Sequence, residues 1–133
     1  MMAVMSDGTD EKAANKELVI RYMTRAQAND LEGAEECLAE DCVRMGPRPS
    51  AGLIEGHPHV DLYQPGTLTM EVENLIAEGP FVAAQIAVQA TAAGGDPYQN
   101  YYHQLFECHE GKITAQWEYL DTLYASRVLK RSL

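Results

Sequence analysis

Residues 98–121, "YQNYYHQLFECHEGKITAQWEYLD", contain two segments of alternating side-chain character, separated by "HEG". A period of two is typical of β-strands with one buried face, and a short turn containing glycine joins two such strands into a hairpin. The pattern predicts antiparallel strands over Pro97–His109 and Lys112–Asp121. The second strand carries two carboxyl groups around an aromatic residue, Glu118 and Asp121. The role of each acid is the first functional question that this sequence raises.

Two further strands are predicted before this hairpin, over Thr67–Glu78 and Phe81–Ala93. The strings "EGP" and "AGGDP" supply the turns between consecutive strands. Together the four segments predict an antiparallel meander. A last helical segment is expected over Thr122–Leu129, and Asp121 is placed to cap it, because its carboxylate can accept hydrogen bonds from free N–H groups of the first turn.

The first half of the chain has a helical pattern instead. One helix is predicted over Glu11–Asn29 and a second over Leu31–Ala39, with Asp30 as the N-cap of the second. The string "CVRMG" at 42–46 is a short strand candidate. The apolar stripe of the first helix consists of Leu18, Val19, Tyr22, Met23 and Ala26. Helices followed by antiparallel strands predict an α+β domain, in which N-terminal helices pack on a curved, cone-shaped antiparallel sheet.

Length and composition fit one ordinary globular domain. The chain has 133 residues, so we expect a flexible leader over 1–10 and a single domain over 11–133. The N-terminal string "MMAVMSDGTDEK" lacks the basic and apolar regions of a secretory signal, and no apolar run reaches the roughly 20 residues that span a bilayer. A cytoplasmic protein without a membrane partner is therefore expected.

The net charge and the cysteine content exclude further classes of partner and of structural bond. Ten basic against twenty acidic residues give a formal net charge of −10, which disfavours nucleic acid and anionic membrane surfaces as partners. The three cysteines, Cys37, Cys42 and Cys108, are odd in number and lack C-x-x-C spacing. Buried, reduced thiols are expected rather than disulfides or a zinc site.

Two strings resemble the nuclear transport factor 2-like superfamily. They are "VIRYMTRAQANDLEGAEECLAEDCV" at 19–43 and the hairpin at 98–121, where an aromatic strand, "EGKI" and a strand ending "EYLD" form the closing hairpin typical of the family. Within the superfamily the chain is most similar to the SnoaL-like group of polyketide cyclases, ketosteroid isomerases and limonene-epoxide hydrolases. The stretch "HPHVDLYQPG" is a departure, since the family usually has a full helix there.

The resemblance also selects one face of the last two strands as the wall of a concave pocket. The residues expected on this inner face are Asn100, Tyr102, Gln104, Phe106, Gln116, Glu118 and Leu120. The opposite, outer face is expected to carry Tyr101, His103, Leu105, Ile113, Trp117 and Tyr119. So many apolar and aromatic groups on one face predict a homodimer formed through the outer face of the sheet.

Glu118 is the leading catalytic candidate. It falls where SnoaL-like cyclases and epoxide hydrolases carry their acidic residue, and burial would raise its pKa toward the range useful for a general acid or base. The alternative is a solvated or hydrogen-bonded strand glutamate. Tyr22 matches the tyrosine with which ketosteroid isomerases bind an oxyanion, and the alternative is a core tyrosine.

Further residues are expected to contact the substrate. Arg44 either points inward, to pair with Glu118 or bind an anionic group, or points outward into a surface ion pair. The amides of Asn100 and Gln104 either contact the substrate or satisfy each other. The full set of predicted substrate-binding residues is Arg44, Asn100, Tyr102, Gln104, His57, Phe106 and Leu120.

Several catalytic residues of the related enzymes are replaced here by residues that cannot transfer a proton. Gly46 replaces the base of the ketosteroid isomerases, and the resemblance places Gln85 and Ala87 where the epoxide hydrolases have an arginine and an aspartate. His57 and His59 form an H-x-H pair, but no further ligands stand at recognised spacing, so no metal is expected. A histidine at the pocket mouth is the more useful interpretation of His57, and two solvated loop histidines are the alternative.

The sequence thus favours a cofactor-independent isomerase, cyclase or dehydratase. Such an enzyme would use acid–base proton transfer on a hydrophobic carbonyl or polyketide-like substrate in an apolar pocket, with Glu118 and Tyr22 as catalytic residues. The alternative is a domain that binds a small hydrophobic ligand without chemistry, and a protein-binding adaptor is third. The fold occurs in all three classes of protein, so only the residues of the site can distinguish between these functions.

Overall fold

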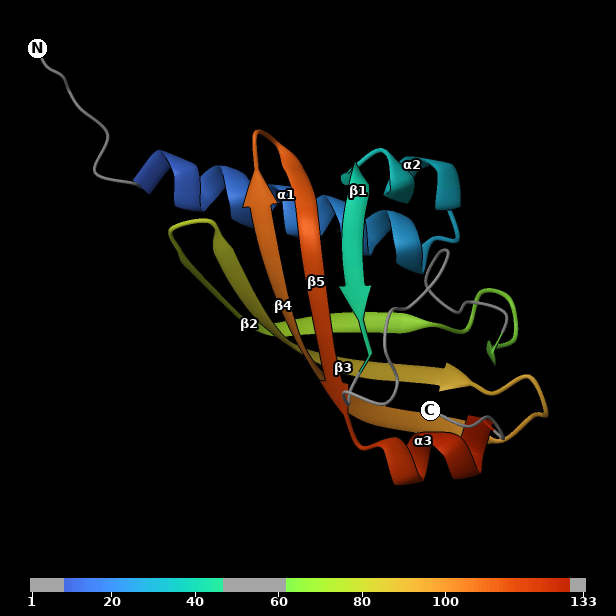
Figure 1. Ribbon diagram of the computed structural model, residues 1–133. Helices are drawn as coiled ribbons and strands as arrows, with labels where there is room; N and C mark the ends of the chain where they lie inside the picture. Colours follow the sequence, from blue (N-terminus) through green and yellow to red (C-terminus); the bar gives the residue numbers. More distant parts are fainter. Residues whose placement is uncertain (1–8, 47–61, 130–133) are drawn as a thin grey trace, which may run out of the picture.

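A computed structural model describes residues 9–46 and 62–129, which form helices at both ends of the chain and one five-stranded sheet between them (Figure 1). The elements in chain order are α1 (Thr9–Gln27), α2 (Leu31–Glu35), β1 (Leu38–Met45), β2 (Thr69–Glu78), β3 (Phe81–Thr91), β4 (Pro97–His109), β5 (Lys112–Leu120) and α3 (Thr122–Leu129). The strand order in the sheet is β1-β5-β4-β3-β2.

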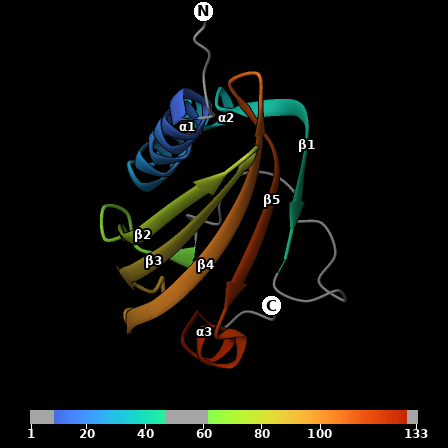
Figure 2. The same cartoon turned by 90° about the vertical axis from the view of Figure 1, so that its left-hand side faces the viewer.

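The predicted α+β architecture is confirmed. Strands β2 to β5 form the expected antiparallel meander, and β1 adds to the free edge of β5 in parallel, which makes the sheet mixed. The sheet curves from β2 round to β1, with α1 and α2 across one end and α3 at the other (Figure 2). The inner face of this curve is the side on which α1 packs, so it holds the core.

The second helix and the first strand differ from their predictions. The helix α2 ends at Glu35 rather than Ala39, and β1 begins at Leu38 rather than at Cys42. The cause is long-range pairing, because Leu38 lies opposite Ile113 of β5 and the Ile113 amide donates to the Cys37 carbonyl at 2.8 Å. Asp30 caps α2 as predicted, accepting from the Gly33 amide at 2.9 Å.

The first helix buries the predicted stripe. It begins at Thr9, inside the expected leader, and Asp10 and Glu11 lie in its first turn, where the helix dipole favours negative charge. The buried core of the described residues joins this stripe to the sheet: Leu18, Val19, Tyr22, Met23, Ala26, Val82, Ala84, Ile86, Val88, Tyr98, Phe106, Cys108 and Ile113, with Ala34, Cys37 and Ala125. Cys42 is only partly buried, and all three cysteines are free.

Strand parity places the inner-face residues as predicted, with one correction. Ile113 was expected on the outer face, but it is fully buried, at 0% exposure. The register explains the error, because Glu107 pairs with Ala115 while Cys108 pairs with Ile113, which leaves Thr114 as an extra residue. This β-bulge reverses the alternation before it. The Thr114 hydroxyl donates to the Glu107 carbonyl at 3.1 Å.

The outer face exposes aromatic side chains. Tyr101 is 65% exposed and Tyr119 49%, which fits the expectation of an interface, and the homodimer stays a prediction. Asp121 caps α3 as predicted, because its Oδ1 accepts from the Tyr124 amide at 3.0 Å. Within 9–46 and 62–129, no helix has the length and apolar character needed to cross a bilayer.

Candidate functional site

Glu118 lies on the inner face of β5, directly opposite Gln104 of β4. The Gln104 Nε2 donates to the Glu118 Oε1 at 2.7 Å. This bond fixes the carboxyl group in one orientation and leaves its second oxygen outside the pair. The alternative of a freely solvated strand glutamate is therefore not what the geometry shows, since the side chain is partly buried and held by a neighbour.

The surroundings of Glu118 disfavour its negative charge. Burial raises the pKa of Glu118 above the ordinary value of 4.5, while the Gln104 hydrogen bond and the charge of Arg44 lower it to a smaller extent. A carboxyl group whose pKa is raised by burial can hold or accept a proton closer to neutral pH. Glu118 is thus suited to proton transfer.

The same shift predicts a stability effect that is independent of any substrate. Between pH 4.5 and the raised pKa of Glu118, the folded chain retains a proton that the unfolded chain has lost, so stability falls as pH rises through this interval. Glu118→Gln removes this loss and keeps an acceptor for Gln104. We expect a higher Tm for Glu118→Gln than for wild type at pH 7, and equal values below pH 4.

The size of the effect follows from linkage. Each pKa unit corresponds to about 1.4 kcal/mol, which moves the Tm of a domain of this size by roughly 3–6 °C. The matched control is Glu71→Gln, which removes an exposed strand glutamate and the same charge. A thermal melt series across pH in which both variants behave alike would contradict a buried, proton-retaining Glu118.

Tyr22 projects from α1 into the core, where its ring meets the edge of Phe106 with centroids 6.1 Å apart. Its hydroxyl is buried and has no hydrogen-bond partner among the described residues. Burial raises the pKa of Tyr22 to about 12, although Arg44 opposes the rise. The phenol therefore keeps its proton and is a free hydrogen-bond donor.

Arg44 resolves the choice that the sequence left open, because it points inward. It is 8% exposed, and its Nε donates to the Gln116 Oε1 at 3.4 Å. Its Nη1 has no partner within the described part of the chain. Arg44 and Gln116 are direct neighbours across the parallel β1–β5 pair, so the guanidinium shares the inner face with Glu118.

A cluster of tyrosine hydroxyls lies on the same face, and sequence reasoning found only one member of it. The Tyr102 hydroxyl lies 2.8 Å from that of Tyr98 and 3.3 Å from that of Tyr63. Burial raises the pKa values of all three, that of Tyr63 to about 12. Tyr98 has the same strand parity as Tyr102 and could have been found from it, whereas Tyr63 comes from an irregular segment.

The other predicted substrate-binding residues fall into two groups. Asn100 forms hydrogen bonds within the fold, because its Nδ2 donates to the Tyr98 hydroxyl at 3.0 Å and to the Asp121 carbonyl at 3.2 Å. Asn100 and Gln104 thus do not satisfy each other. Phe106 is fully buried and Leu120 partly buried on the inner face, where they supply apolar surface near Glu118.

The predicted placement of Gln85 and Ala87 at catalytic positions on β3 needs a correction. Gln85 is exposed and accepts from the Asn74 side chain at 2.8 Å, and Ala87 pairs with the outward Tyr101. Both therefore lie on the outer face, one residue out of phase with the core. The inner positions of β3 are Ala84, Ile86 and Val88, all buried and apolar, so this strand still offers no acid or base to Glu118. Gly46 follows β1 and offers none either.

The histidine pair lies outside the described residues, which include neither His57 nor His59. Among the residues that are described, no group of three or more His, Cys, Asp or Glu side chains is placed to hold a metal ion. His103 is exposed on the outer face, and His109 lies at the end of β4, 2.8 Å from the Glu107 carboxylate.

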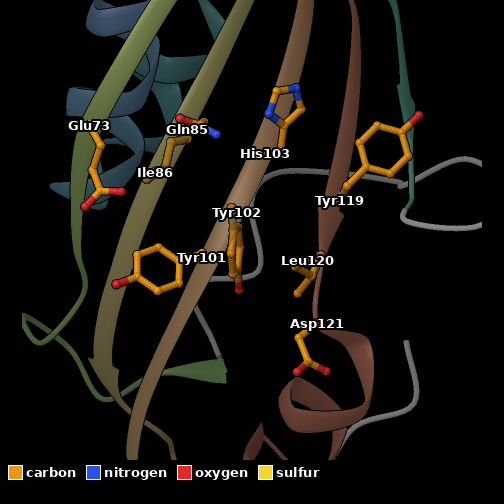
Figure 3. A pocket seen from close by; sticks show the side chains of 9 residues that line it. All are labelled: Glu73, Gln85, Ile86, Tyr101, Tyr102, His103, Tyr119, Leu120 and Asp121. Carbon is orange, nitrogen blue, oxygen red and sulfur yellow. The ribbon is translucent and has the colours of Figure 1, made fainter.

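The structure also has a hollow of about 370 Å³ whose lining does not include Glu118. It is lined by Glu73, Gln85, Ile86, Tyr101, Tyr102, His103, Tyr119, Leu120 and Asp121 (Figure 3). Tyr101 and Tyr119 extend from neighbouring strands in opposite directions, which leaves open space between them. Most of its lining comes from the outer face, with Ile86, Tyr102 and Leu120 added from inner-face positions, and neither Glu118 nor Tyr22 takes part.

A curved sheet with N-terminal helices packed on its inner face is the fold of the nuclear transport factor 2-like proteins. The sequence profile of the SnoaL-like domain matches residues 19–116, well over half of the chain. The chain therefore belongs to the SnoaL-like domain family. No curated protein sequence matches it.

Solved structures with the same fold are numerous. A proposed SnoaL-like polyketide cyclase from Jannaschia sp. CCS1 superposes with a TM-score of 0.78 and 17% identity, covering 97% of this chain and 100% of that one. AclR, a proposed hydroxylase from Streptomyces galilaeus, gives 0.73 and 18%, covering 90% and 97%. IdmH, a proposed polyketide cyclase from Streptomyces antibioticus, gives 0.67 and 18%, covering 88% and 99%. At these sequence identities the similarity shows a shared fold and nothing about a shared activity.

Proposed function

We propose that this protein catalyses proton transfer on a hydrophobic carbonyl or polyketide-like molecule, as an isomerase, cyclase or dehydratase. The observation that carries the proposal is the Glu118 carboxyl group, held at 2.7 Å by Gln104 on the inner face, where burial raises its pKa. Two of the similar structures are proposed polyketide cyclases, which supports the substrate class.

In this scheme Glu118 removes a proton from a carbon next to the substrate carbonyl and later returns it to another position. The charge that develops on the carbonyl oxygen needs a donor, and the Tyr22 hydroxyl is unpartnered within the described residues and keeps its proton. A preorganised donor of this kind lowers the barrier because it is already oriented toward the developing charge. The partly buried Leu120 supplies an apolar contact to the carbon skeleton, and the fully buried Phe106 packs beneath the site.

A second function is favoured by the apolar positions on β3. Ala84, Ile86 and Val88 provide no partner for Glu118 in proton transfer, and such a wall suits a domain that only binds a small hydrophobic ligand. In that case Glu118 and Tyr22 would orient the ligand through hydrogen bonds.

Deuterium exchange separates the two functions. Two hydrophobic carbonyl compounds with acidic C–H bonds, 2-tetralone and anthrone, are incubated with the protein in D₂O, and exchange is followed by NMR. We expect the wild-type protein to exchange the acidic position faster than buffer does. If a compound raises the Tm of the protein but exchanges its acidic position no faster than in buffer, the protein binds it without chemistry. That result would favour the ligand-binding function instead.

A further inference from the structure

Arg44 is a buried cation that forms no ion pair with a carboxylate among the described residues. It is 8% exposed, and its Nε donates to the neutral Gln116 amide, with the Oε1 as acceptor, at 3.4 Å. Its Nη1 makes no hydrogen bond within the described residues. No described carboxylate forms an ion pair with it, although the chain has twenty acidic residues. A buried charge without a partner is costly, which is why such groups normally bind an opposite charge.

The placement of this cation relates it to the candidate site. Arg44 lies opposite Gln116 across the parallel strand pair, and Glu118 is the next inner-face position of β5. Residues two apart in a strand are separated by about 7 Å. The positive charge reaches the other groups, since Arg44 lowers the pKa values of both Tyr22 and Glu118.

We propose that Arg44, oriented by Gln116, is an anion-binding subsite, and that the molecule bound on the inner face is a hydrophobic acid. Its carboxylate, or an equally acidic enol or phenol oxygen, accepts from the free Nη1, and its apolar body lies along the partly buried Leu120. A guanidinium fork matches a carboxylate better than a carbonyl oxygen does, because it can donate two parallel hydrogen bonds.

This inference deepens the proposed function, since it names the substrate class of the same site. The anionic group at Arg44 would lie about one inner-face position away from the carbon that exchanges its proton at Glu118. The two roles use different atoms, because the anion accepts from the Arg44 Nη1 while the proton is transferred at the Glu118 carboxyl group.

The test compares an acid with its neutral counterpart. Affinities of 2-naphthoate and 2-naphthamide are measured by calorimetry at pH 7, and the Nε–Hε resonance of Arg44 is followed by NMR. We expect the wild-type protein to bind the acid roughly 10- to 100-fold more tightly than the amide, as a charge-assisted hydrogen bond would give. The acid, and not the amide, should shift the Arg44 resonance.

Variants test whether Arg44 causes the preference for the acid over the amide. Arg44→Gln should abolish it by weakening naphthoate alone, Arg44→Lys should restore part of it, and Arg21→Gln, an exposed arginine of α1, should leave it unchanged. If Arg44→Gln does not fold, Gln116→Met keeps the arginine but removes its acceptor, and the preference should fall.

Two results would overturn the proposal: equal affinity of the wild-type protein for both probes, or a preference that survives in Arg44→Gln and Gln116→Met. Neither depends on catalysis. Failure of the subsite therefore leaves proton transfer by Glu118 untouched, and absence of deuterium exchange leaves the acid preference intact.

Discussion

Glu118→Gln is expected to slow deuterium exchange of a matched carbonyl compound by roughly 10²- to 10⁴-fold, the contribution typical of a positioned acid or base. Glutamine has almost the same shape, and its side-chain oxygen can still accept from the Gln104 Nε2, which lies 2.7 Å from the Glu118 Oε1. It cannot take a proton. Ligand affinity should therefore change little while the rate of exchange falls.

The pH profile provides the second half of this prediction. Exchange by wild type should rise with pH as Glu118 loses its proton, and this rise should lie above pH 4.5, because burial raises the pKa of Glu118. The variant should lack this rise, whereas the control Glu71→Gln should retain it. An exchange rate in Glu118→Gln equal to that of wild type would exclude Glu118 as the base.

Phe106→Ala is expected to lower the free energy of unfolding by roughly 3–5 kcal/mol, the cost typical of removing a buried phenylalanine ring. The Phe106 side chain is fully buried between the sheet and α1, and it forms the edge contact with Tyr22. Removing it leaves a cavity directly under the candidate site. Urea unfolding followed by circular dichroism measures the change.

The matched control for this variant is Leu123→Ala. Leu123 is 60% exposed on α3, and alanine is the better helix former, so stability should change by less than about 0.5 kcal/mol. A Phe106→Ala variant as stable as this control would mean that the inner face around residue 106 is not the packed core that the structure describes.

The parts of the fold that local signals specify were predictable. The β4 bounds Pro97–His109 and the α3 bounds Thr122–Leu129 agree with their predictions, because a Gly-containing turn and an aspartate cap mark them in the sequence. The turn places Glu110 and Gly111 at positive φ, a conformation that glycine adopts without strain.

The features that depend on distant contacts were not predictable. The parallel pairing of β1 with β5 draws Leu38 into a strand, and nothing in the local string "CLAED" indicates this. The burial of Ile113 depends on the extra residue at Thr114. In the same way, Gln85 and Ala87 were assigned to the inner face by resemblance, and a shift of one residue in a strand reverses the face.

The candidate site was predicted in part for the same reasons. Glu118, Gln104 and Tyr102 follow from strand parity alone once one face is known, and the structure brings Glu118 and Gln104 together. Tyr63 was missed because it reaches Tyr102 from a segment that has no periodicity to read. The inward orientation of Arg44 required the parallel neighbour Gln116, which only the folded chain provides.

The bulge at Thr114 divides β5 into two parts with opposite alternation of side chains. Ile113, before the bulge, belongs to the core, while the positions after it that face inward are Gln116, Glu118 and Leu120. The register shift separates these three positions from the core position of Ile113. A single inserted residue thus lets one strand serve the core at Ile113 and the candidate site at Glu118 from the same face.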